Sequence, residues 1–192
     1  MKAEYKNAIQ SRRKICSAYL TLLTETNNKF SVTDIVKLAG INRGTFYLHF
    51  ENLQAVEKSI IEELANNFKV LEQDFRQAEI DKTPELILNK FNEILLKDLD
   101  YYRLIINASE NYNLIEKIKV SILTAISNNF KIMQYVMNYD HFKMVVQYIV
   151  GGVIDTYIDW FKGNLTCSIE EISSFLSKLI KGGLKGCINY GI

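Results

Sequence analysis

The sequence is poor in residues that interrupt helices or cross-link the chain. One of its 192 residues is proline and nine are glycine. Because β-sandwiches and barrels usually need more turn residues, an all-α chain is favoured. The three cysteines, Cys16, Cys167 and Cys187, are odd in number and lie far apart, so neither a disulfide framework nor a paired zinc motif can be assigned to them.

Metal-binding and catalytic patterns are also lacking. His49 and His141 are the two histidines, and together with the dispersed cysteines they argue against a metal site. The sequence contains no glycine-rich phosphate loop, no HExxH and no GxSxG. We therefore expect no metal, no cofactor and no enzyme activity, and a helical enzyme is the least favoured alternative.

Long apolar runs are absent as well. No run approaches the roughly 18 residues that a membrane span needs, which predicts no membrane partner. Residues 1–10 are polar and include no apolar h-region, which predicts no secretory signal and a cytoplasmic location. Hydrophobic residues make up 48% of the chain, which is enough to build a globular core.

The charges are unevenly distributed. Residues 1–58 hold nine basic and five acidic residues, a net charge of +4, whereas residues 59–192 hold 14 and 17, a net charge of −3. This division suggests an anionic partner for the N-terminal part alone, although an ordinary solvated face would have the same charge.

Apolar residues recur at helical spacing through almost the whole chain. Ser31 and Asp34 form a capping-box pattern, Gly40 marks a helix end, and Asn42 is a good N-cap for the next helix. We expect a small bundle over residues 1–50 and a larger one over 51–192, joined by a connecting helix over 51–79. The expected helices, about nine, span approximately 7–26, 32–39, 43–50, 52–79, 83–95, 101–108, 114–137, 142–161 and 169–184.

The stretch from Ser31 to Phe50, SVTDIVKLAGINRGTFYLHF, carries the strongest indication of function. A short helix, a glycine turn and a second short helix form the helix-turn-helix plan. The second helix presents polar side chains, and its N-terminus offers free N–H groups that suit a phosphate. Gly44, near that N-terminus, leaves room for a close approach of the backbone.

The segment AGINRGTFYLHF resembles the signature of the TetR family of bacterial transcriptional regulators, and the match covers residues 10–62 approximately. The stretch from Gly151 through Trp160 to Glu171 also resembles the paired C-terminal helices of many members. The resemblance implies an N-terminal three-helix helix-turn-helix DNA-binding domain at 1–50 and a helical ligand-binding and dimerisation domain at 51–192.

The resemblance implies DNA contacts from both short helices. Asn42 and Arg43 would reach base edges, since asparagine suits adenine and arginine suits guanine. Thr45 would contact a phosphate or a thymine methyl group, and Tyr47 and His49 match the phosphate-binding pair of the family. The two hydroxyl residues that begin the preceding helix would contact the DNA backbone or a flanking base. The implied DNA-binding set is Ser31, Thr33, Asn42, Arg43, Gly44, Thr45, Tyr47 and His49.

One position departs from the family. Members usually have a phosphate-binding lysine at the head of the connecting helix, where this chain has Leu53. Either Asn52 replaces that contact, or the contact is absent and binding is weaker and more sensitive to salt. Basic residues of the N-terminal arm could compensate, namely Lys6, Arg12, Arg13 and Lys14.

The larger bundle implies a ligand pocket and a dimer interface. Aromatic and methionine residues of the middle helices often line the pocket in this family, although for any one of them ordinary core is the more common role. The candidates are Phe91, Tyr101, Tyr102, Tyr112, Phe130, Met133, Met137 and Tyr148. The last two helices are too apolar for a single buried face, which favours a four-helix interface between two copies. Its candidates are Val146, Val150, Val153, Ile154, Tyr157, Ile172, Leu176 and Leu179.

These observations predict a homodimeric TetR-like repressor that a small-molecule ligand releases from a palindromic DNA operator. A two-fold dimer would place two recognition helices about 34 Å apart, in successive major grooves. The alternative is a co-regulator whose larger bundle binds a protein partner instead of a small ligand.

Overall fold

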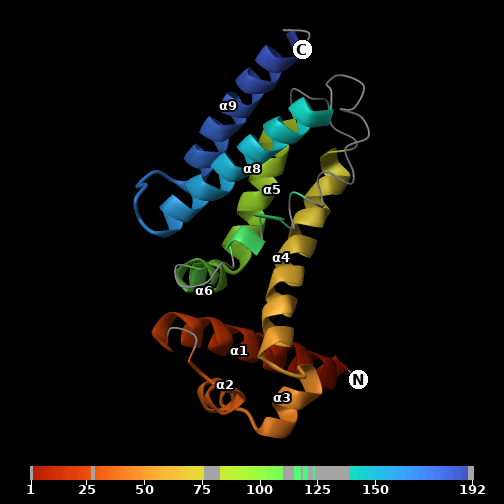
Figure 1. The fold of residues 1–192 in the computed structure, drawn as a ribbon, viewed down its shortest axis with the longest axis vertical. Coiled ribbons are helices and arrows are strands. Elements are labelled where there is room, and N and C mark those ends of the chain that lie inside the picture. The colour runs from red at the N-terminus through yellow and green to blue at the C-terminus, as the bar shows by residue number, and fades with distance from the viewer. Residues whose placement is uncertain are drawn as a thin grey trace. The chain divides into compact units, whose positions relative to one another are not determined.

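The computed structural model describes residues 2–26, 29–75, 83–109, 115–117, 119–120, 123 and 139–189. Within these residues every regular element is a helix, which confirms the all-α fold (Figure 1). The helix expected over 114–137 falls mostly outside the described residues. The helices are α1 (Lys2–Thr26), α2 (Val32–Ala39), α3 (Arg43–His49), α4 (Leu53–Phe75), α5 (Thr83–Lys97), α6 (Leu99–Ser109), α8 (Tyr139–Phe161) and α9 (Ile169–Asn189).

The chain divides into two compact units. Unit 1 comprises residues 1–64 and 100–117, and unit 2 comprises residues 65–99 and 118–192. The division falls within α4 and places nearly all of α6 in unit 1. The expected domain boundary at residue 50 was drawn from the helix-turn-helix pattern alone and stays a prediction.

Unit 1 has a core of apolar side chains from its three N-terminal helices and from α4. Helices α1, α2 and α3 pack against one another. They are anchored by side chains that solvent does not reach, among them Leu20, Ile35 and Phe46. Complete burial of such side chains contributes about 1.5–3 kcal/mol each. Lys117 forms an ion pair with Glu57 of α4, so the segment after α6 also contacts this helix.

The described part of unit 2 contains α5, α8, α9 and the C-terminal part of α4. Helix α9 packs against both α5 and α8 (Figure 1). Its N-terminus has the expected capping box, in which Ser168 N–H donates to Glu171 Oε2 at 2.7 Å and Glu171 N–H donates to Ser168 Oγ at 3.1 Å. Among the described residues, no helix is both long and apolar enough to cross a membrane.

A buried polar network joins α5, α8 and α9. Tyr157 Oη donates to Asn92 Oδ1 at 2.5 Å, and Asn92 Nδ2 donates to the Ile169 carbonyl at 3.1 Å. The ring of Phe91 meets that of Tyr157 edge to face, with centroids 4.7 Å apart. Burial raises the pKa of Tyr157, so its hydroxyl keeps the proton that it donates to Asn92.

Candidate DNA interface

The start of α2 is fixed by a cap that joins Ser31 and Asp34. The Ser31 N–H and hydroxyl both donate to Asp34 Oδ2, at 2.8 and 2.7 Å. These bonds, the one from the hydroxyl first, stabilise the carboxylate and hold the pKa of Asp34 below its ordinary value of 3.8. The predicted capping box is therefore confirmed. It also engages the Ser31 hydroxyl, which was expected to contact DNA.

The turn between α2 and α3 depends on the backbone of Gly40. Its φ of 62° lies in the left-handed region. The Gly40 N–H donates to the Lys37 carbonyl at 3.3 Å, and the Ile41 N–H donates to the Val36 carbonyl at 3.1 Å. A Cβ at Gly40 would meet no atom within 4 Å. Glycine is thus favoured here by its backbone conformation and not by lack of space.

Helix α3 is capped at its start and anchored in its middle. Asn42 Oδ1 accepts hydrogen bonds from the Thr45 N–H at 2.7 Å and from the Thr45 hydroxyl at 3.1 Å. Phe46 is completely buried, and its ring lies 6.2 Å from that of Phe50. Because the Phe46 side fixes α3 to the core, the opposite side of the helix faces outward.

That outward side carries the residues expected to contact DNA. Arg43, Gly44 and Tyr47 are exposed, and positions 43 and 47 are one turn apart. Tyr47 is 56% exposed although it is aromatic. His49 and Thr45 are half-buried beside them. The structure therefore exposes Arg43, Gly44 and Tyr47 along one side of α3, whereas Thr45 and His49 lie on a less exposed side.

A hydrogen bond connects the α2 and α3 members of the set. Arg43 Nη2 donates to Thr33 Oγ1 at 2.5 Å, and both side chains are exposed. Asn42 is also exposed, but its side-chain oxygen is used within the cap of α3. Arg43 and Tyr47 therefore supply the most accessible polar groups of α3.

Two exposed apolar residues were missing from the predicted set. Leu48, on α3 beside Tyr47, is 80% exposed, and Leu38, near the end of α2, is 50% exposed. Apolar side chains can contact the thymine methyl group in the major groove. Helical spacing in the sequence could have predicted that Leu48 is exposed, since it lies one turn after Gly44 and not on the side of Phe46.

The head of α4 shows how Asn52 is used. Its Oδ1 accepts the Ala55 N–H at 2.9 Å, so the residue caps the helix. Its amide nitrogen is the donor that could bind a phosphate. Leu53, where the family usually has lysine, is half-buried and offers no donor.

Two of the basic residues of α1 have partners within unit 1. Arg12 Nη2 donates to Ser59 Oγ at 2.6 Å, and its guanidinium lies 4.7 Å from the centroid of the Phe50 ring. Arg13 forms an ion pair with Glu63 at 2.9 Å and stacks on the Tyr101 ring. These contacts fasten α1 to its neighbours, whereas Lys14 is exposed. The side chain of Lys6 lies outside the described part of the chain.

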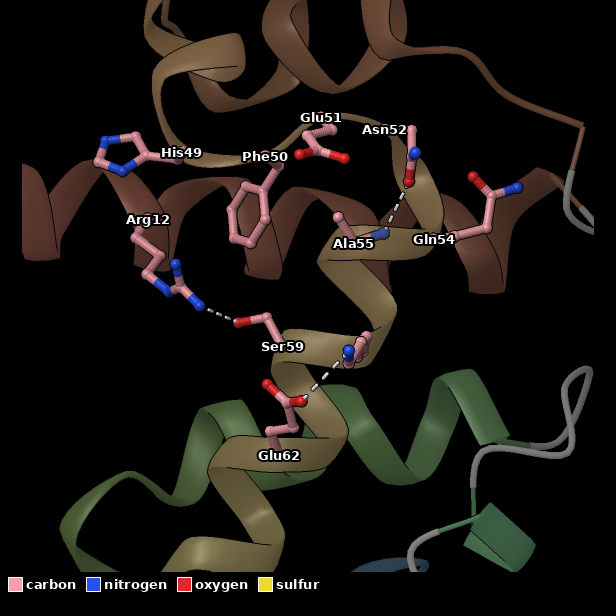
Figure 2. A pocket seen from close by; sticks show the side chains of 10 residues that line it. Arg12, His49, Phe50, Glu51, Asn52, Gln54, Ala55, Ser59 and Glu62 are labelled. Carbon is pink, nitrogen blue, oxygen red and sulfur yellow. Dashed lines mark hydrogen bonds and ion pairs between the residues drawn. The ribbon is translucent and has the colours of Figure 1, made fainter.

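An open hollow of about 490 Å³ lies between α1 and the head of α4 (Figure 2). Arg12 and His49 line it on one side, and Lys58 lines it beside Glu62, with 3.8 Å between Lys58 Nζ and Glu62 Oε1. Glu51 is a further acidic residue in the lining. Because both signs of charge are present, the hollow is not selective for anions.

The residues expected to line a ligand pocket do not share one environment. Phe91 is buried in unit 2, whereas Tyr101 and Tyr102 are buried in unit 1. Tyr148 is 85% exposed, which does not suit the wall of an enclosed pocket within one protomer. The pocket stays a prediction. The remaining candidates lie outside the described residues, namely Tyr112, Phe130, Met133 and Met137.

The residues expected at the dimer interface also differ in exposure. Val146, Tyr157 and Ile172 are buried within the protomer, where they stabilise unit 2 itself. Leu179 is 56% exposed. The other candidates are half-buried, namely Val150, Val153, Ile154 and Leu176. Exposed apolar side chains that the prediction omitted are Met144 on α8 and Phe175 on α9.

Solved structures share this fold along nearly the whole chain. The fatty acid degradation regulator FadR from Bacillus halodurans is 17% identical, with coverage of 91% of this chain and 96% of its own and a TM-score of 0.65. The transcriptional regulator FadR from Bacillus subtilis, solved in complex with stearoyl-CoA, is 20% identical, with coverage of 89% and 98% and a TM-score of 0.63. A TetR transcriptional regulator from Streptococcus agalactiae is 18% identical, with coverage of 93% and 98% and a TM-score of 0.54.

Comparison by sequence gives the family. No curated protein matches the chain. Residues 82–182, more than half of the chain, match the model of the TetR-type transcriptional regulator C-terminal region. This match covers the part that the helix-turn-helix pattern does not, and the fold of the solved regulators agrees with both. The chain belongs to the TetR family of transcriptional regulators.

Proposed function

We propose that this regulator is a repressor that binds a palindromic DNA operator as a homodimer and is released from it by a small-molecule ligand. The observation that carries the proposal is the outward face of α3, where Arg43 and Tyr47 are exposed while Phe46 between them is completely buried. A rigidly anchored helix with exposed polar groups suits insertion into a major groove. The proposal places the protein in the cytoplasm, where such an operator would be.

The roles follow from the chemistry of the exposed groups. Arg43 would donate to guanine O6 and N7, since its fork of N–H groups matches these two acceptors. Tyr47 and His49 would donate to phosphates and set the position of α3 in the groove. Gly44 would let the backbone approach the DNA, and Leu48 would contact a thymine methyl group.

Dimerisation would use α8 and α9. TetR-type regulators act as dimers, and the exposed apolar side chains Met144, Tyr148, Phe175 and Leu179 all lie on these two helices. Apolar side chains on the surface of a soluble chain favour an interface with a second copy. A two-fold axis would pair the two recognition helices with the two halves of a palindrome.

Long-chain acyl-CoA is the ligand class to test first. TetR-type regulators bind small molecules, and one solved structure of the same fold holds stearoyl-CoA. Ligand binding to the larger bundle would favour a dimer conformation in which the recognition helices no longer match the operator. The aromatic candidates predicted for the pocket would then contact the acyl chain.

The first experiment is selection of randomised duplex DNA by the purified protein at two salt concentrations. We expect one palindrome to be enriched, Arg43→Ala to relax the preference at the base pair that it contacts, and Tyr47→Ala to weaken binding to all sequences. Lys97→Ala, which removes an exposed charge from α5, is the control and should leave the enrichment unchanged. Binding that is sensitive to salt but indifferent to sequence would contradict the proposal.

The second experiment adds ligands to the complex with the selected palindrome. Stearoyl-CoA should release the DNA, whereas coenzyme A without an acyl chain should not. If neither stearoyl-CoA nor shorter acyl-CoA esters change the operator affinity, the acyl-CoA proposal is wrong. A protein that selects the palindrome but whose operator affinity no acyl-CoA changes would favour the alternative, in which the larger bundle binds a protein partner.

A further inference from the structure

The hydrogen bond between Arg43 and Thr33 joins the first turns of two different helices. Thr33 is the second residue of α2, and Arg43 is the first residue of α3. Nη2 of Arg43 donates to Oγ1 of Thr33 over 2.5 Å. Both side chains are exposed, so this bond lies on the surface proposed to face DNA.

The neighbouring side-chain acceptors take part in the caps of the two helices. Asp34, the residue after Thr33, would be a stronger partner for a guanidinium because it is charged. Its Oδ2, however, accepts both the N–H and the hydroxyl of Ser31. The side-chain oxygen of Asn42, before Arg43, accepts both donors of Thr45. These oxygens hold the local caps, and in the structure Arg43 donates to the neutral hydroxyl of Thr33.

A neutral partner has a specific consequence for DNA binding. An ion pair with a carboxylate would neutralise the guanidinium and would have to be broken before Arg43 could donate to a base. The Thr33 hydroxyl leaves the positive charge intact. It uses one of the five N–H donors of Arg43, so enough donors remain for the two parallel bonds to guanine.

The bond also restricts the side chain before DNA arrives. An unrestrained surface arginine occupies many rotamers, and binding must select one of them at a cost in entropy. A side chain that is already directed across the α2–α3 surface loses less freedom on binding. The smaller entropy cost would strengthen binding at the base pair that Arg43 contacts and at no other base pair.

We propose that Thr33 is a positioning residue that orients Arg43, so that discrimination at the base pair under Arg43 depends on a hydroxyl from the other helix. The inference rests on the proposed function, since it requires that α3 binds DNA. It differs from a direct role of Thr33 in binding the DNA backbone or a flanking base. In the direct role, Thr33 would act without Arg43.

The test combines four variants with the palindrome selected by the wild-type protein. Arg43→Ala identifies the base pair whose preference depends on Arg43. Thr33→Val keeps the shape of the side chain but removes the hydroxyl, and Thr33→Ser keeps the hydroxyl. The double variant Thr33→Val with Arg43→Ala completes the cycle. Affinities are measured for the palindrome and for duplexes altered at single base pairs.

We expect Thr33→Val to reduce discrimination at the Arg43-dependent base pair by roughly tenfold, the effect of one immobilised long side chain. Thr33→Ser should retain it. In the Arg43→Ala background, Thr33→Val should have no further effect. Thermal unfolding should be unchanged in all variants, because both side chains are exposed.

Three results would overturn the inference while leaving the proposed function intact. Thr33→Val could keep the full preference, could lose preference at a different base pair, or could weaken binding equally with and without Arg43. The last two outcomes would assign Thr33 a DNA contact of its own. If the wild-type protein selects no palindrome, the proposed function fails and this inference fails with it.

Discussion

At the scale of single residues, burial and exposure alternate over very short distances. Phe46 is completely buried, whereas Tyr47 and Leu48, the next two residues, are 56% and 80% exposed. The tight turn of an α-helix makes this possible, since consecutive side chains point in directions about 100° apart. A seven-residue helix can therefore be fixed by one aromatic ring and still present most of its surface to a partner.

The partners of charged side chains also differ between adjacent residues. Arg12 and Arg13 are adjacent in the sequence, yet each is held by a different partner on α4, Ser59 and Glu63 respectively. The count of basic residues predicted an anionic partner for the N-terminal part. It could not show that the Arg13 charge is already paired, because pairing depends on which side chains the fold brings within reach.

A prediction at this scale concerns the reactivity of the cysteines. Burial, followed by the charge of Glu63, raises the pKa of Cys16 from 9.0 to about 11, and its side chain is 2% exposed. Because the thiolate is the reactive species, Cys16 should resist alkylation at about pH 8 in the folded protein. Exposed Cys167 should react before Cys16.

Peptide mapping by mass spectrometry after a short exposure to iodoacetamide distinguishes the two thiols. In denaturant both should react at similar rates, which serves as the control. Equal labelling of Cys16 and Cys167 in the folded protein would show that α1 opens readily.

The raised pKa of Cys16 also means that the folded state holds the thiol proton more tightly than the unfolded state does. The free energy of unfolding should therefore fall as the pH rises from 9 toward 11.

At the scale of elements, the bounds of a helix were predicted best where capping residues mark both of its ends. The bounds of α2 agree at both ends with the prediction, because Ser31 and Asp34 mark its start and Gly40 its end. Helix α3 ends at His49, one residue before the predicted end, since Phe50 has extended backbone. Helix α1 begins at Lys2 and not near Asn7, because its first residues are polar and gave no apolar periodicity.

The packing of α6 could not be predicted from the sequence. Tyr101 and Tyr102 were assigned to a ligand pocket because aromatic residues line such pockets, but aromatic residues also fill cores. In the structure both are buried in unit 1, with Arg13 stacked on Tyr101. Periodicity identifies the buried side of a helix but not the element that covers it, and that choice depends on tertiary contacts.

The turn at Gly40 provides a second prediction. A non-glycine residue at a φ of 62° is strained, so Gly40→Ala should destabilise the protein by about 1–2 kcal/mol. Gly40→Asn should cost less, since asparagine tolerates the left-handed region better. Chemical denaturation measures both, and equal stability of all three proteins would contradict the role assigned to this turn.

The polar network of unit 2 gives a third prediction. Asn92→Ala would leave the Tyr157 hydroxyl and the Ile169 carbonyl without their partner in a buried site, so a loss of about 2–5 kcal/mol is expected. Tyr157→Phe keeps the ring against Phe91 but leaves Asn92 Oδ1 without its donor, so its cost should be about 1–3 kcal/mol.

Chemical denaturation of both single variants and of the double variant tests the network. The two losses should not add, because the residues share one hydrogen bond. Simple additivity would indicate that Asn92 and Tyr157 act independently, contrary to the structure.

At the scale of the whole molecule, operator binding depends on symmetry. A single α3 covers one half of a palindrome, and a half-site alone offers few contacts. The second copy must therefore be held by an interface, and the exposed apolar residues on α8 and α9 are the proposed surface. Residues such as Tyr157 and Ile172, which the sequence placed in that interface, are buried within the protomer and are unsuitable for testing it.

The decisive variant therefore places charge on exposed positions only. Tyr148, on α8, is 85% exposed and Leu179, on α9, is 56% exposed. The double variant Tyr148→Glu with Leu179→Glu should leave the fold intact but put four unpaired carboxylates into a two-fold interface, where desolvation and repulsion oppose association. Sedimentation should then show monomers at micromolar concentration where the wild-type protein is a dimer.

Circular dichroism should show unchanged helix content in this variant, and the affinity for the full palindrome should fall by at least about tenfold while weak half-site binding persists. Lys97→Glu, an exposed charge change on α5, serves as the control for added negative charge. If the double variant remains a dimer with full operator affinity, the two copies associate through another surface. The apolar residues on α8 and α9 would then be available to a different partner, as the co-regulator alternative requires.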